Sequence, residues 1–147
     1  MSKPISSKLI FVNLPVADLP RAVAFYEQVG ATRNPQFSDD TAACMVLSQT
    51  IHVMLLTHAK FRQFTSKPIV DAKTQCEVLL CLSAESRAEV DDVVAKAVAS
   101  GGSGDPTGVQ DHGFMYGRGF EDPDGHIWEV MWMDLAAASA AHAPAEA

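Results

Sequence analysis

The sequence has no long hydrophobic run and no concentration of basic residues. No apolar stretch reaches the roughly 18 residues that suggest a membrane-spanning helix, and residues 1–8 lack the apolar core of a signal peptide. Eleven Lys and Arg residues stand against eighteen Asp and Glu residues, which gives a net charge of −7. These absences argue against a membrane or a nucleic acid as the partner.

Cysteine is also scarce. The three cysteines, Cys44, Cys76 and Cys81, are odd in number and show no Cys-x-x-Cys spacing. Each lies in an apolar, strand-like stretch, which favours reduced and buried thiols. We therefore expect a cytoplasmic protein without a disulfide framework.

The length and composition of the chain are typical of a globular protein. The chain has 147 residues, 48% of them hydrophobic, which is enough for the core of one domain. We expect that domain to span residues 1–134. The alanine-rich remainder, residues 135–147, has no periodic apolar stripe and is expected to be a flexible tail.

The chain repeats one order of elements. The first half predicts a strand, a helix that Asp18 begins and Gly30 ends, and three short strands. The second half predicts the same order about sixty-six residues later, with Ser83–Ser86 beginning the helix and Gly101-Gly102 ending it. The expected strands are 9–16, 33–37, 42–48 and 51–57, then 76–82, 107–111, 114–120 and 126–133. This pattern predicts an α+β fold of two βαβββ modules, 8–57 and 75–133, that form a cupped mixed sheet.

The last predicted strand carries the most unusual side chain. It follows the turn formed by residues 122–125, where Pro123 presets φ and Gly125 can adopt a positive φ. Side chains alternate along a strand, so Glu129 shares one face with the apolar Ile127 and Met131. A carboxylate among apolar neighbours is costly unless it is paired, protonated, metal-bound or open to a solvent-filled cavity. Glu129 is therefore the centre of the predicted site.

Two segments carry a family resemblance. Residues 16–26, Val-Ala-Asp-Leu-Pro-Arg-Ala-Val-Ala-Phe-Tyr, and residues 122–129, Asp-Pro-Asp-Gly-His-Ile-Trp-Glu, resemble the two ends of the vicinal oxygen chelate superfamily. This superfamily includes glyoxalase I (lactoylglutathione lyase), extradiol dioxygenases and the bleomycin- and fosfomycin-resistance proteins. The resemblance covers about residues 8–133 and implies a homodimer with a small-molecule pocket in the sheet.

The resemblance also implies positions for metal ligands, two in each module. They fall on Phe11, Met54, Glu77 and Glu129, of which only the two glutamates could bind a metal. A reduced metal site of His52, Glu77 and Glu129 is an alternative, as is a divalent metal that is held weakly or not at all. Without a metal, Glu77 and Glu129 are the catalytic candidates.

Further residues are candidates for contact with a substrate. Strand alternation places Asn13 on the side of Phe11, and His52 on the side of Met54. Near the last hairpin, Arg118 could clamp a carboxylate or phosphate, or form an ordinary surface salt bridge. The predicted substrate-binding set is Phe11, Asn13, Met54, Tyr116 and Arg118.

Two functions remain open. The first is a lactoylglutathione lyase type of enzyme, in which a carboxylate moves a proton next to a carbonyl and a metal stabilises the enediolate. The second is a metal-free binding protein of the bleomycin-resistance type, without catalysis. The retained glutamates favour the first function, and the absence of histidine at position 11 favours the second.

Overall fold

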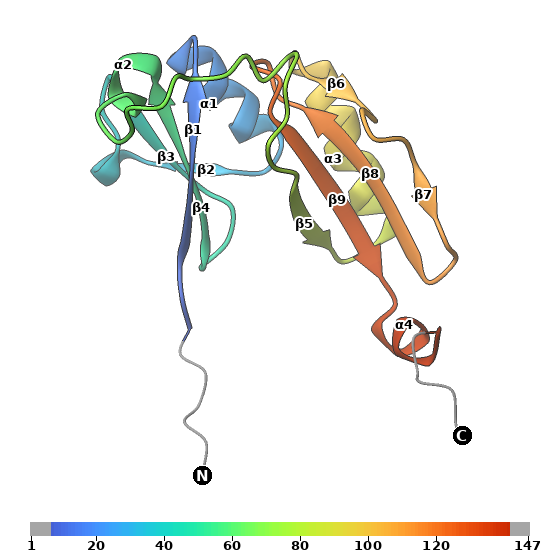
Figure 1. Cartoon of the computed structure of the whole chain (residues 1–147). Coiled ribbons are helices and arrows are strands. Elements are labelled where there is room, and N and C mark those ends of the chain that lie inside the picture. The colour runs from blue at the N-terminus through green and yellow to red at the C-terminus, as the bar shows by residue number, and fades with distance from the viewer. Residues whose placement is uncertain (1–6, 142–147) are drawn as a thin grey trace. The chain divides into compact units, whose positions relative to one another are not determined.

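The computed structural model describes residues 7–141. Its contacts divide the chain into two compact units, with the boundary between Val70 and Asp71 (Figure 1). Each unit pairs a mixed sheet with a covering helix, so the α+β class predicted from the sequence is confirmed. Among the described residues, no helix has the length and apolarity needed to cross a membrane.

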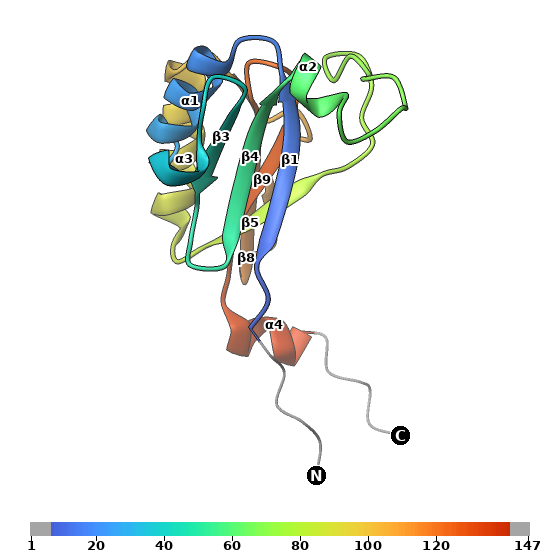
Figure 2. The same ribbon diagram turned by 90° about the vertical axis from the view of Figure 1, so that its left-hand side faces the viewer.

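Unit 1 is a four-stranded sheet with one helix packed on a face. The elements of unit 1 are β1 (Ile10–Val16), α1 (Leu19–Gln28), β2 (Thr32–Asn34), a 3-10 turn η1 (Pro35–Phe37), β3 (Ala42–Val46), β4 (Ile51–Thr57) and α2 (His58–Phe61). The sheet order is β1-β4-β3-β2, with β1 parallel to β4 and the other pairs antiparallel. Helix α1 packs on β3 and β4 (Figure 2).

The sequence explains where α1 begins and ends. The Asp18 side chain accepts a hydrogen bond of 3.1 Å from the Arg21 amide, which caps the first turn. Gly30 adopts φ +112°, which ends the helix. Between them, Phe25 and Tyr26 are fully buried and form part of the unit 1 core.

Unit 2 has the same plan. Its elements are β5 (Leu80–Ala84), α3 (Arg87–Ala99), β6 (Ser103–Gly104), β7 (Gln110–Asp111), β8 (Met115–Glu121), β9 (Ile127–Met133) and α4 (Leu135–Ala141). The strand order is β5-β9-β8-β6, with β7 also paired to β8, and α3 packs on β8 and β9 (Figure 1). Ser86 caps α3 by accepting a 3.1 Å hydrogen bond from the Glu89 amide.

Several predicted boundaries were wrong, each for a local reason. The strand expected at 33–37 stops at Asn34, because Pro35 lacks the N–H that would continue the ladder. The strand expected at 107–111 is replaced by the short β6 and β7, with a turn at Pro106–Gly108 between them. The strand expected from residue 76 begins only at Leu80.

The C-terminal segment also differs from its prediction. Residues 135–141 form α4 rather than a flexible tail, because alanine has the highest helix propensity and Asp134 accepts a hydrogen bond of 3.1 Å from the Ala137 amide. Ala138 is buried. The rest of the predicted tail, residues 142–147, lies outside the described residues.

Candidate functional site

Glu129 lies in the middle of β9, on the face of the unit 2 sheet that α3 does not cover. It pairs in register with Cys81 of the parallel strand β5 and with Gly119 of the antiparallel strand β8. Paired residues project to the same side, so Cys81 and Glu129 share this face with Met131. Strand alternation predicted that Glu129 and Met131 lie on the same face of the sheet.

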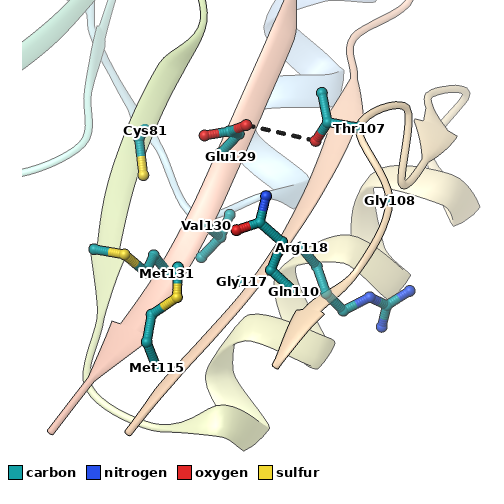
Figure 3. A pocket seen from close by; sticks show the side chains of 10 residues that line it. All are labelled: Cys81, Thr107, Gly108, Gln110, Met115, Gly117, Arg118, Glu129, Val130 and Met131. Carbon is teal, nitrogen blue, oxygen red and sulfur yellow. Dashed lines mark hydrogen bonds between the residues drawn. The ribbon is translucent and has the colours of Figure 1, made fainter. Parts of the chain in front are cut away.

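A small pocket surrounds the Glu129 carboxylate (Figure 3). Its volume is about 50 Å³, which is room for a few atoms of a ligand, and it is open on one side. The residues that line it come from β5, β7, β8, β9 and the segment between β6 and β7. The lining is Cys81, Thr107, Gly108, Gln110, Met115, Gly117, Arg118, Glu129, Val130 and Met131.

Glycine makes the close approach of this segment possible. A Cβ at Gly119 would lie 2.9 Å from the Trp128 carbonyl oxygen, 3.5 Å from Thr107 Oγ1 and 3.6 Å from Pro106 Cδ. Pro106 and Thr107 therefore pack directly over the backbone of β8. The Thr107 hydroxyl reaches Glu129 Oε1 in a long hydrogen bond of 3.5 Å.

Cys81 is a poor nucleophile in this setting. Burial raises the pKa of its thiol, and the nearby negative charge of Glu129 raises that pKa further. A thiol with a raised pKa stays protonated at neutral pH, and the thiolate is the reactive form. Cys81 therefore contributes a soft, polarisable surface to the pocket rather than a reactive group.

Arg118 lies on the opposite face of β8 from Glu129. Its guanidinium donates two hydrogen bonds to Asp105 (3.0 and 2.7 Å) and one to Asp91 of α3 (3.0 Å). The Tyr116 hydroxyl donates to the same Asp91 oxygen at 2.6 Å. Both side chains thus help to pack α3 and the β6–β7 segment, and the substrate contact expected of them stays a prediction.

The hydrogen bonds of this cluster shift the pKa values of its carboxylates. The hydrogen bonds from Arg118 hold the pKa of Asp105 below its usual value, and those from Tyr116 and Arg118 do the same for Asp91. A second arginine, Arg87, donates to both carboxylate oxygens of Asp111 at 2.8 and 2.9 Å, which lowers the pKa of Asp111 to about 2.

The open face of unit 1 is aromatic and apolar where unit 2 has its carboxylate. Phe11 and His52 pair in register and stack, with ring centroids 4.6 Å apart. The next pair on this face is Asn13 with Met54, and the Asn13 amide donates to the Phe11 carbonyl oxygen at 3.1 Å. The structure brings these four predicted residues together on one face, and half of the Phe11 surface is exposed (49%).

Glu77 is not part of a strand. It lies in an exposed bend three residues before β5. The strand registers show which residue of unit 2 corresponds to Phe11 of unit 1. Asn13 pairs with Met54 as Cys81 pairs with Glu129, so Asn13 corresponds to Cys81. Phe11 stands two residues before Asn13, and its counterpart therefore stands two residues before Cys81. Two residues before Cys81 stands Leu79, so the position expected for Glu77 is held by an apolar side chain.

The donor set does not fit the four-ligand metal centre that the resemblance implies. Of its four positions, Phe11, Met54 and now Leu79 offer no ligand for a hard divalent cation, and Glu129 alone is a carboxylate. No group of three or more His, Cys, Asp or Glu side chains within residues 7–141 is placed to hold a metal ion. The alternative set of His52, Glu77 and Glu129 does not form such a group.

Sequence reasoning missed several pocket residues. Thr107 and Gln110 were assigned to a strand, whereas the chain turns at Gly108 and folds back over β8. The signal was the Asp105-Pro106-Thr107-Gly108 run, which has turn chemistry rather than strand chemistry. Met115 lay inside the expected strand 114–120, but no face of the sheet was assigned to it.

Comparisons with known proteins agree with this architecture. A family model described as the Glyoxalase/Bleomycin resistance protein/Dioxygenase superfamily matches residues 8–130. A hypothetical protein from S. aureus is 23% identical, with a TM-score of 0.72 over 87% of this chain and 94% of that one. No curated protein matches the sequence.

Two further solved structures have similar folds. A glyoxalase-related enzyme from Fulvimarina pelagi is 17% identical, with a TM-score of 0.71 over 86% of this chain and 88% of its own. A fosfomycin resistance protein from Mesorhizobium loti is 16% identical, with a TM-score of 0.64 over 91% and 98% of the two chains. At these identities the likeness shows the fold alone.

Proposed function

Because the chain belongs to the glyoxalase/bleomycin resistance protein/dioxygenase superfamily, we propose that it binds a small organic molecule at the Glu129 pocket without a four-ligand metal centre. The observation that carries this proposal is the carboxylate of Glu129 in a pocket where Cys81, Met115 and Met131 supply sulfur and where Thr107 and Gln110 add polar groups. The superfamily supports many chemistries on one scaffold, so the proposal rests on this site and not on the fold.

The pocket favours a ligand with a positively charged head and an apolar body. Among the described residues that line the pocket, two ionisable side chains point into it, Glu129 and Cys81 (Figure 3). Cys81 is protonated, so the charge in the pocket is that of Glu129. A cationic or hydrogen-bond-donating group would satisfy it, and the Gln110 amide would add a donor and an acceptor. Met115 and Met131 are flexible and polarisable, which suits an apolar group of variable shape.

A lactoylglutathione lyase type of reaction is the second candidate. It is favoured by one observation, that a carboxylate stands on the open sheet face at the position where the superfamily has its last ligand. Glu129 would remove a proton next to a carbonyl, and the Thr107 hydroxyl and Gln110 amide would orient the substrate oxygens. Without further ligands, the developing negative charge would lack the stabilisation that this chemistry needs.

The two candidates separate in one set of measurements on the full chain. Benzyltrimethylammonium is the binding probe, and neopentylbenzene is its neutral isostere. We expect the cation to bind at least about tenfold more tightly than the isostere, because only the cation pairs with Glu129. Glu129→Gln should remove that preference, while Asp92→Asn, which removes an exposed carboxylate on α3, should leave it unchanged.

The catalytic candidate is tested with the hemithioacetal of methylglyoxal and glutathione. Turnover that falls by about 10² or more in Glu129→Gln would establish the lyase and overturn the binding proposal. Equal affinity for the cation and the isostere would also overturn it. Glu77→Gln in the same assays tests whether the exposed Glu77 takes any part.

Assembly as a homodimer is part of the proposal. It is supported by apolar side chains that are about half exposed near the sheet edges, Ile10 (53%) and Leu79 (52%) among them. Sedimentation at micromolar concentration should give twice the chain mass of 15.8 kDa. A single species at the chain mass would refute this part.

A further inference from the structure

We propose that Arg118 is a positioning residue for the pocket: it holds the β6–β7 segment, residues 105–109, so that the Thr107 hydroxyl stays beside Glu129. This inference builds on the proposed function, because it concerns the same pocket. It assigns to Arg118 a role at a distance, in place of the direct ligand contact that the sequence predicted.

The segment is tied down at its first residue. Asp105 accepts two of the three hydrogen bonds of the Arg118 guanidinium, one on each carboxylate oxygen, at 3.0 and 2.7 Å. Its backbone N–H donates to the Gly119 carbonyl oxygen at 2.8 Å. The two side chains are only 24% and 27% exposed, so water screens this bidentate pair less than an ordinary surface pair.

From this anchor the chain reverses direction over the pocket. Asp105 adopts φ +52°, a left-handed conformation that among the described residues other than glycine only Asp105 has. The Gly108 N–H then donates to the Asp105 carbonyl oxygen at 3.1 Å, which closes a turn with Thr107 near its tip. A left-handed aspartate persists when its surroundings hold it, and the Arg118 pair is what holds its side chain.

The alternation of β8 explains how one strand serves both faces. Arg118 stands between Gly117 and Gly119, and the two glycines face the pocket while the arginine faces α3. Figure 3 shows Arg118 pointing away from Glu129, and Thr107 pointing toward it. The guanidinium therefore acts through the backbone of residues 105–107, because it points away from Glu129.

A second arginine holds β7, the strand that follows the segment. Arg87 of α3 donates hydrogen bonds to both carboxylate oxygens of Asp111, and it also donates to the Gly113 carbonyl oxygen at 2.9 Å. Its guanidinium lies 5.0 and 5.3 Å from the ring centroids of Tyr116 and Trp132. The Arg87–Asp111 pair is more exposed than the Arg118–Asp105 pair, at 40% and 51%, so we assign the main positioning role to Arg118.

The test measures the segment directly, by amide hydrogen exchange on the full chain. Asp105→Asn keeps a residue that tolerates a left-handed backbone but removes the negative charge that pairs with Arg118. We expect the Gly108 amide to exchange at least tenfold faster in Asp105→Asn and in Arg118→Ala, with Arg118→Lys intermediate because an ammonium cannot bind both oxygens in a fork. Amides in the middle of α3 should keep their wild-type rates.

Two control variants separate positioning from general stability. Asp92→Asn breaks the exposed Lys96–Asp92 pair on α3 and should leave the Gly108 amide unchanged. Asp91→Ala removes the acceptor of the hydrogen bond between Arg118 and α3 while leaving the Asp105 pair in place, and it should also leave the Gly108 amide unchanged. Wild-type exchange at Gly108 in Asp105→Asn, or an equal rise throughout α3, would overturn the inference.

The consequence for the pocket is read with the same cationic probe. Benzyltrimethylammonium should bind Asp105→Asn several-fold more weakly than wild type, with partial recovery of affinity in Arg118→Lys relative to Arg118→Ala. If the wild-type protein does not bind this probe, the proposed function fails. The exchange rates of Gly108 decide the positioning role independently of that result.

Discussion

The two units share a plan but present different chemistry at matching positions. Where unit 1 pairs Asn13 with Met54, unit 2 pairs Cys81 with Glu129. Unit 1 has an aromatic stack of Phe11 on His52 on its open face, and unit 2 has a carboxylate pocket. At these matching positions the repeated fold thus places a carboxylate in unit 2 only, and a metal centre that needs ligands from both copies loses its basis.

The units also differ in how the segment before their central strands is held. In unit 1, Asp39 caps its own turn by accepting from the Thr41 and Ala42 amides at 2.7 and 3.0 Å. In unit 2 the segment depends on Arg118 and Arg87, which lie 13 and 24 residues from their carboxylate partners. The first arrangement forms locally, whereas the second requires the sheet and α3 to be in place.

The largest expected effect compares two glycines that both have positive φ. A Cβ at Gly125 of unit 2 would lie 2.7 Å from the backbone of Ala72 and Lys73, whereas a Cβ at Gly30 of unit 1 would meet nothing within 4 Å. Gly125→Ala should therefore lower the free energy of unfolding by about 3 kcal/mol or more. Gly30→Ala should cost only the backbone strain, about 1–2 kcal/mol.

Urea unfolding of both variants measures this difference. Equal losses in the two variants would mean that the backbone around residues 72–73 moves away without cost.

A smaller effect is expected from giving unit 1 the ligands that it lacks. Phe11→His combined with Met54→Glu would add an imidazole and a carboxylate to the sheet face that already carries His52. We expect zinc affinity to rise by about tenfold or more over wild type, because zinc favours imidazole and carboxylate ligands. Isothermal titration with zinc measures the change.

The matched control is Phe11→His combined with Met54→Gln, which adds the imidazole without the carboxylate. If this control gained as much affinity as the first variant, the carboxylate would have no part in the new site.

The smallest effect concerns acid, and it distinguishes the long-range pairs of unit 2. The pKa of Asp111 is lowered to about 2 by Arg87 from a usual value of 3.8. The pair therefore contributes stability above about pH 4, and that contribution is lost as the pH falls through about 2. Asp111→Asn should flatten the decline of the urea midpoint between these pH values.

Lys96→Ala, which breaks only the exposed pair on α3, should leave the slope as in the wild type. A decline that stays as steep in Asp111→Asn would assign the acid sensitivity to other carboxylates.

Sequence patterns predicted the fold well where a pattern was local. The capping aspartate Asp18 and the positive-φ Gly30 delimited α1, and β4 was predicted at its observed bounds. The position of Glu129 on the same face as Met131 followed from alternation alone. These features depend on neighbours in the chain, and the sequence displays neighbours directly.

What depended on tertiary contacts could not be predicted. The sequence alone does not distinguish an Arg118 that binds a ligand from one that binds Asp105. Only the pairing of β8 with β6 brings the Asp105 carboxylate within reach of Arg118. Glu77 was placed in a strand because residues 76–82 are largely apolar, although its strand begins at Leu80. The start of a parallel strand is set by its partner, here β9, and the partner is distant in sequence.

The Gly117-Arg118-Gly119 triplet also fixes how β8 can pair. A slip of one residue would turn every side chain of β8 to the other face of the sheet. The guanidinium would then leave both of its carboxylates, and two glycines would face α3, where Val90 and Val94 are fully buried. Such a misaligned sheet would lose packing and ion pairs together, so the triplet discriminates against mispaired forms during folding as well as shaping the finished site.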